Sequence, residues 1–248
     1  MSTPTRDDEL LAAIETHDVA ALERLLGPGD AALAVRGKAL VVWLLEMYFR
    51  SPRFPACLRL LLDRAGRLDD PVLVAVLLDD AAAVRAALAA DPAALRRPVD
   101  LVSAFTPLTG ASMLHVAAEY GNAAAARSLL AAGADVDARA ADGHTPLFHT
   151  VSSLLDHGAA VMHVLLEAGA RIDVRLPFLC WGRSFEWETT LFDVTPITWC
   201  QAGLLPQWHR READVYRNLR ALLAAGARTV PPLPNVPNRY LQPKGRGG

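Results

Sequence analysis

The sequence SMLHVAAEYG occupies residues 112–121, and LLAAGADVD follows at residues 129–137. A second copy comes next, because residues 142–148 read DGHTPLF and residues 165–173 read LLEAGARID. Its TPL aligns with the SML of the first copy at an offset of 33 residues. Self-similarity at a fixed period is the sequence signature of a repeat architecture. We therefore expect a stack of similar units rather than one closed core.

The residue types in each copy have a mechanical reason. The hydroxyl of Thr145 is placed to cap a helix, and Pro146 takes the first helical position, where no N–H is needed. Ala117 and Ala118 have small side chains, which let neighbouring first helices lie close together. Glycines that follow the second helix of a unit are expected to end it in the left-handed conformation, and they are Gly133, Gly169 and Gly226. Each copy therefore predicts two antiparallel helices.

These features resemble the ankyrin repeat family, whose period they share and whose Thr-Pro-Leu-His signature they match in part, as SMLH at residues 112–115 and TPLF at residues 145–148. The resemblance covers about residues 112–230, and a rhythm of paired helices extends it over residues 7–100. It implies an all-α fold: an ankyrin-repeat solenoid of about six helix pairs, with short β-hairpin fingers of which one is extended. It also implies a general role in binding other proteins and no chemistry of its own.

The expected ankyrin-repeat domain spans residues 7–230. Residues 231–248 form a tail rich in proline and glycine, for which we expect an extended or disordered chain with little regular structure. The six units of the domain are expected at residues 7–29, 30–68, 69–103, 104–137, 138–174 and 175–230.

The last unit carries an insertion. Thr195-Pro196 follows Thr145-Pro146 by 50 residues instead of 33, so about seventeen residues are added, and they fall within residues 176–194. Residues 185–189 alternate apolar and polar side chains at the period of a β-strand. We expect a long hairpin here.

Seven of the sixteen aromatic residues fall within 31 positions at this insertion and just after it: Phe178, Trp181, Phe185, Trp187, Phe192, Trp199 and Trp208. One interpretation is that the hairpin folds back and uses these rings as a small core of its own. The other is that some rings, chiefly Trp181, Phe185 and Trp187, stay exposed as an anchor for a partner. The two interpretations are compatible.

The resemblance also indicates which residues face a partner, because ankyrin repeats use the finger and the positions just after the paired small residues. With the residues of the extended finger, the predicted partner-binding set is Glu119, Tyr120, Asp142, His144, Trp181, Arg183, Phe185 and Trp187. His115 occupies the position of a histidine that bonds the backbone of the next unit, so we assign it a structural role.

Composition limits the class of protein. The 248 residues are 52% apolar and 21% charged, with a net charge of −2, which argues against nucleic acid or anionic lipid as partners. Three cysteines without metal-ligand spacing and no secretory leader favour the cytoplasm. Arginine outnumbers lysine 23 to 2, which hints at a GC-rich bacterial genome. We expect a monomer that takes no cofactor.

No catalytic motif is present in the sequence, and surface or capping roles are favoured over a metal site for His144, His149, His157 and His163. The sequence therefore predicts a non-catalytic interaction scaffold that binds an unknown protein through its fingers and concave face. An inhibitor or regulatory subunit of an enzyme is the alternative. Less favoured is an enzyme with its site under the hairpin at residues 176–194, using Glu186, Glu188 or Asp193.

Overall fold

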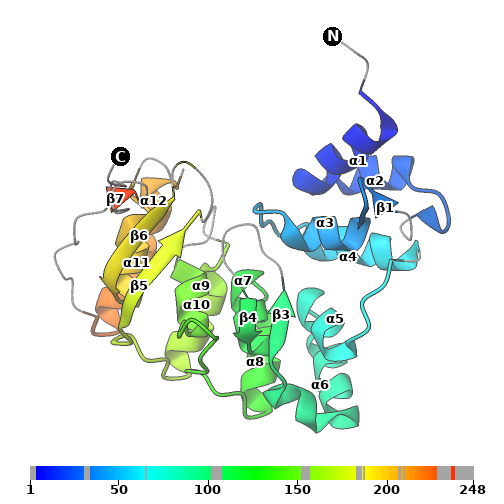
Figure 1. Cartoon of the computed structure of the whole chain (residues 1–248). Coiled ribbons are helices and arrows are strands. Elements are labelled where there is room, and N and C mark those ends of the chain that lie inside the picture. The colour runs from blue at the N-terminus through cyan, green and yellow to red at the C-terminus, as the bar shows by residue number, and fades with distance from the viewer. Residues whose placement is uncertain are drawn as a thin grey trace, which may run out of the picture.

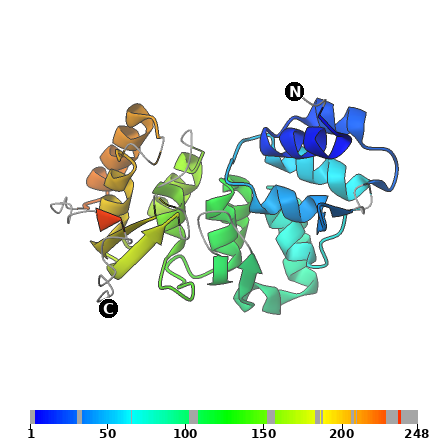
Figure 2. The same ribbon diagram turned by 45° about the horizontal axis from the view of Figure 1, so that its top comes forward.

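Helix pairs follow one another along an arc in the computed structural model of the chain (Figure 1). The structure describes residues 4–30, 34–64, 66–101, 108–151, 157–182, 186, 188–205, 208, 210–227 and 236–237. Turned by 45°, it shows the N-terminal helices at one end and the C-terminal helices at the other (Figure 2). Such a row of helix pairs with small hairpins is the architecture of a helical repeat protein.

The N-terminal part consists of four helices and one small hairpin: α1 (Arg6–Glu15), α2 (Val19–Leu25), β1 (Ala34–Val35), β2 (Lys38–Ala39), α3 (Leu40–Glu46) and α4 (Phe54–Asp63). α1 begins where Thr5 and Asp8 form a reciprocal capping box. α2 begins where the carboxylate of Asp18 accepts the backbone N–H of Ala21 at 3.0 Å. The helix ends are thus fixed by local polar side chains.

The central part contains six α-helices, one 3₁₀ helix and a hairpin: α5 (Pro71–Leu77), α6 (Ala81–Ala90), η2 (Pro92–Arg96), β3 (Val99–Leu101), β4 (Leu108–Ala111), α7 (Met113–Glu119), α8 (Ala123–Ala131), α9 (Pro146–Val151) and α10 (Ala159–Glu167). Aspartates cap α5 and α6, because Asp70 and Asp80 each accept two backbone N–H groups. Ala117 and Ala118 are fully buried in α7, which packs beside α5 and α9. The predicted close approach of first helices is therefore confirmed.

Most of the predicted helix boundaries are confirmed. Ser112 caps α7, and α9 begins at Pro146. The three glycines that were expected to be left-handed have φ angles of 91°, 83° and 98° at Gly133, Gly169 and Gly226. One detail differs, because the buried hydroxyl of Thr145 makes no hydrogen bond with any residue that the structure describes. Pro146 thus begins this helix without help from the threonine side chain.

The C-terminal part joins two helices to a three-stranded sheet: β5 (Leu176–Trp181), β6 (Thr189–Val194), α11 (Pro196–Ala202), α12 (Glu212–Ala224) and β7 (Val236–Pro237). The strands lie in the order β5-β6-β7, and all pairs are antiparallel. The long hairpin is therefore as predicted. β7 belongs to residues 231–248, for which little regular structure was expected. A proline is tolerated there because β7 is an edge strand and needs fewer N–H donors.

Apolar side chains form one continuous core that runs from Leu10 in α1 to Leu222 in α12. Because each helix pair buries its apolar face against the pairs beside it, the core is a long strip and not a central ball. The fingers and loops lie along the edge of this strip. They are the parts that remain available to other molecules.

Candidate interaction surface

Tyr120 ends α7 and is buried, with 1% of its surface exposed. Its hydroxyl donates a hydrogen bond of 2.9 Å to the carbonyl oxygen of Leu45. Its ring centroid lies 4.7 Å from that of Phe54 and 4.4 Å from the guanidinium carbon of Arg50. The sequence places Tyr120 at a partner-facing position, and its burial corrects that prediction. We call this contact between the N-terminal helices and α7, formed by Leu45, Arg50, Phe54, Glu119 and Tyr120, the tyrosine joint.

Glu119 is largely committed to contacts within the chain. One oxygen of its carboxylate lies 3.5 Å from Nη2 of Arg50, and the other lies 3.0 Å from Nδ1 of His149 in α9. Its side chain is 12% exposed, and that of Arg50 is 5% exposed. Burying a charged side chain costs free energy, and an oppositely charged partner offsets much of that cost. Glu119 therefore links two neighbouring elements to α7 and offers little of its surface to another protein.

His115, His144 and His149 pack together between α7 and α9, and we call this contact the histidine joint. Nε2 of His115 donates to the carbonyl oxygen of His144 over 3.1 Å, which is the inter-unit bond expected from the sequence. The centroids of the three rings lie 5.5–5.6 Å apart in two pairs, His115–His149 and His144–His149. Burial lowers the pKa of His115 to about 3. The ring of His115 is therefore neutral near pH 7.

His144 is also buried, which contradicts its predicted exposure to a partner. Burial lowers the pKa of His144, although the neighbouring Asp142 acts against this shift. Nδ1 of His144 lies 2.6 Å from Oδ1 of Asp142, outside the direction of a hydrogen bond. Asp142 itself stays exposed at the turn. Of the four partner-facing residues predicted in these two units, only Asp142 is exposed, with 43% of its side chain accessible to solvent.

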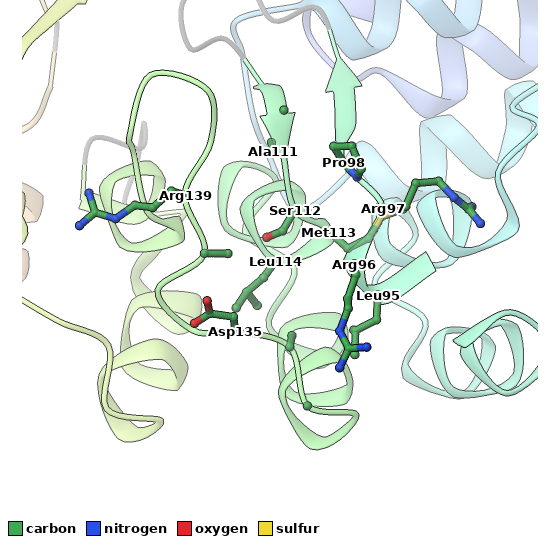
Figure 3. A pocket seen from close by; sticks show the side chains of 14 residues that line it. Leu95, Arg96, Arg97, Pro98, Ala111, Ser112, Met113, Leu114, Asp135 and Arg139 are labelled. Atoms are coloured by element: carbon green, nitrogen blue, oxygen red, sulfur yellow. The ribbon is translucent and has the colours of Figure 1, made fainter. Parts of the chain in front are cut away.

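A pocket of about 230 Å³ opens between residues 95–98, at the end of η2, and the loop at residues 133–139. The end of β4 and the start of α7 form its floor. Ala111 and Met113 are buried residues among those that line it. Arg96 and Asp135 flank the opening in Figure 3, and Ser112 lies between them at the back. No sequence motif indicates this pocket, because its walls come from two different units.

The four histidines considered as metal ligands have other surroundings. His144 and His149 lie in the histidine joint, Nε2 of His157 donates to the carbonyl oxygen of Tyr120 over 2.6 Å, and His163 is exposed on α10. Within the described ranges, no three His, Cys, Asp or Glu side chains are grouped so that they could hold a metal ion. Within the same ranges, no helix has the length and apolar character needed to cross a membrane.

The central helix pairs match a known protein family. A model of the family described as ankyrin repeats (3 copies) matches residues 72–175, less than half of the chain. Residues 72–175 are ankyrin repeats. The matched segment begins within α5, ends just before β5 and contains the histidine joint. Ankyrin repeats are generally protein–protein interaction modules. No curated protein matches the sequence.

The extended finger follows the matched ankyrin segment and has a buried and an exposed face. On the buried face, Trp181 stacks on Trp208 at 4.5 Å between centroids, and Trp199 meets Trp208 edge-on at 4.6 Å. Trp181 is therefore part of a small aromatic core, as the first interpretation of the cluster expects, and its burial corrects its prediction as an exposed partner contact. Arg183, Phe185 and Trp187 lie outside the described residues.

The exposed face of the extended finger carries an aromatic pair. Phe178 in β5 and Phe192 in β6 are direct cross-strand partners. They are 55% and 42% exposed. Cross-strand neighbours on one face lie within about 5.5 Å of each other at Cβ, so the two rings form one apolar patch. The sequence reasoning included both residues in the aromatic cluster but did not select them as partner contacts.

Proposed function

We propose that this protein is a non-catalytic interaction protein that binds another protein through its fingers and concave face. The exposed pair of Phe178 and Phe192 carries the proposal. Aromatic side chains dominate the energy of protein interfaces, and rings of this size are costly to leave in water. Leu179 and Trp181 on the opposite face of β5 are buried, so the patch rests on a packed support.

The proposal includes the number of repeat units, the compartment and the oligomeric state of the protein. Successive helices pair as α1–α2, α3–α4, α5–α6, α7–α8, α9–α10 and α11–α12, which supports six units. The cysteines Cys57 and Cys200 are buried and free, in keeping with a reduced protein that acts in the cytoplasm. We propose that it acts there as a monomer, needing neither metal nor nucleotide.

The test is affinity capture from the source organism with the wild type and a Phe178→Ser/Phe192→Ser variant. A Tyr216→Ser/Leu223→Ser variant is the matched control, because these α12 side chains are 48% and 46% exposed. We expect all three proteins to melt at similar urea concentrations, since exposed rings lose little on unfolding. Only the finger variant should lose the captured protein. Equal capture by the finger variant and the wild type would contradict the proposal.

A further inference from the structure

The pocket between residues 95–98 and the loop at residues 133–139 is too small for a cofactor and large enough for one side chain. Its volume is about 230 Å³. Pockets that hold drug-sized ligands and cofactors usually range from about 300 to 1,000 Å³. The pocket also lies along the finger edge, where the proposed function places the protein partner. A side chain projecting from that partner is therefore the occupant that best matches its size and place.

The charges around the pocket favour an acidic side chain. Arg96, Arg97 and Arg139 line it, against a single carboxylate from Asp135. Arg97 is already paired, because its guanidinium lies 2.5 Å from Asp91 and 3.6 Å from Asp70. Arg139 donates to the carbonyl oxygen of Gly143 at 2.8 Å, and neither it nor Arg96 has an ion pair among the described residues. Within the described chain, the lining therefore carries two arginines without a carboxylate partner, Arg96 and Arg139, and one carboxylate, that of Asp135.

Arg96 is the group best placed to bind the carboxylate. It is exposed at the end of η2, and its side chain lies beside the opening in Figure 3, whereas Arg97 and Arg139 extend away from it. A guanidinium offers a planar set of donors that matches a carboxylate in bidentate geometry. Asp135 works against such a ligand from the opposite side. One of its oxygens already accepts the backbone N–H of Asp137 at 3.0 Å.

The lining below the opening suits a short aliphatic stem. Ala111, Met113 and Leu114 are buried and apolar. The hydroxyl of Ser112 lies 2.8 Å from Nδ1 of His115 and is thus engaged within the protein. We propose that this pocket binds a glutamate-like side chain of the protein partner, with its methylene groups against Met113 and its carboxylate on Arg96. The proposal rests on the proposed function and names the chemistry that the finger edge recognises.

The experiment uses small probes, so its outcome does not depend on capture of a protein partner. The probes are the N-acetyl α-amides of glutamate, glutamine and lysine, titrated into the full chain labelled at its methionine methyl groups. The glutamate probe should shift the Met113 signal with a dissociation constant in the millimolar range, while Met162 in α10 serves as the internal reference. The glutamine probe should bind about tenfold more weakly, because it lacks the charge.

Three variants locate the binding charge. Arg96→Gln should weaken the glutamate probe about tenfold, and Asp135→Asn should strengthen it about twofold by removing the opposing charge. Arg220→Gln on α12 is the control and should change nothing. Equal binding of the glutamate and glutamine probes, preference for the lysine probe, or an unchanged constant in Arg96→Gln would each overturn the inference. If the glutamate titration is intact but the wild type captures no protein, or captures it no better than the Phe178→Ser/Phe192→Ser variant, the result counts against the proposed function alone.

Discussion

The tyrosine joint connects α7 to the N-terminal helices, and the histidine joint connects it to α9. The two contacts use different kinds of interaction. Toward α9, α7 uses the small residues Ala117 and Ala118 and one bond from His115 to a backbone carbonyl. Toward the N-terminal helices, it uses the large ring of Tyr120, which meets Leu45 and the guanidinium of Arg50. The first contact recurs in the ankyrin pattern, and the second does not.

The difference shows how stability is distributed along the array. Small residues spread the energy of a joint over many modest van der Waals contacts, so no single side chain dominates. A fully buried tyrosine with a hydrogen bond and a cation–π contact concentrates the energy in one residue. The N-terminal helices should therefore depend on Tyr120 more than any repeat depends on one of its own residues.

The largest expected effect comes from Tyr120→Ala, which removes a buried ring and leaves a cavity. It should lower the free energy of unfolding by about 3–5 kcal/mol, as other large-to-small changes at aromatic core positions do. Tyr120→Phe keeps the ring and should cost only about 1 kcal/mol, for the lost hydroxyl bond to Leu45. Urea melts of both variants measure this. A Tyr120→Ala protein as stable as Tyr120→Phe would mean that the ring does not hold the joint.

The two joints should also respond differently to pH. Burial lowers the pKa of His115 in the histidine joint to about 3, so the folded state favours its neutral ring. It also lowers the pKa of His17 to about 4, a residue outside both joints whose ring packs against Phe49 and Phe54. The unfolded chain takes up these protons near pH 6.5, and stability is therefore lost as the pH falls below 6.5. For His115 alone, the loss by pH 5 should be about 2 kcal/mol. Urea melts between pH 7.5 and pH 5 measure it.

At alkaline pH the tyrosine joint should weaken. Burial raises the pKa of Tyr120 to about 12, so stability is lost as the pH rises above 10, where the unfolded tyrosine ionises. By pH 11 the loss should be about 1 kcal/mol. Tyr120→Phe should reduce this alkaline loss and leave the acid loss in place. If Tyr120→Phe and the wild type lose the same stability between pH 9 and pH 11, Tyr120 is not the group responsible.

The smallest expected effect compares two glycines. Gly169 ends α10 with φ at 83° and has open space where a Cβ would stand, so Gly169→Val should cost about 1 kcal/mol from backbone strain alone. Gly121 follows Tyr120 with φ at 71°, and a Cβ there would lie 2.6 Å from Nε2 of His157. Gly121→Val should therefore cost more. Thermal melts that rank the two variants in the opposite order would contradict this assignment.

The repeat itself could be predicted because its signals are local. The starts of α7 and α9 and the left-handed glycines follow from residue types at short spacings, and the bond from His115 to the next unit follows from the resemblance to ankyrin repeats. Each such signal acts within one unit or between adjacent units. Such information is fully contained in a sequence window of two repeats.

The burial of Tyr120 could not be predicted in this way. The residue that accepts its hydrogen bond, Leu45, lies 75 positions earlier in the chain. The ankyrin pattern describes the position of Tyr120 within its unit and contains no information on helices that cover it from elsewhere. Only the placement of the α3–α4 connection across the end of α7 decides its exposure.

The two faces of the extended finger were predictable in principle. The strand period of two puts Leu179 and Trp181 on one face and Phe178 on the other. The sequence reasoning grouped the rings by their density along the chain and did not separate them by this alternation. The pairing of Phe178 with Phe192 required the register of the hairpin, which the inserted length alone does not define.

The place of β7 beside β6 has a consequence for the order in which the chain folds. Each helix pair of the array can pack as soon as it and its neighbour have left the ribosome. β6 ends at residue 194, and its second partner is not synthesised until residues 236–237. The sheet of the extended finger is thus completed by a non-local pairing, which forms more slowly than the local contacts of the helices. Vectorial synthesis should finish the repeats first and the finger that bears Phe192 last.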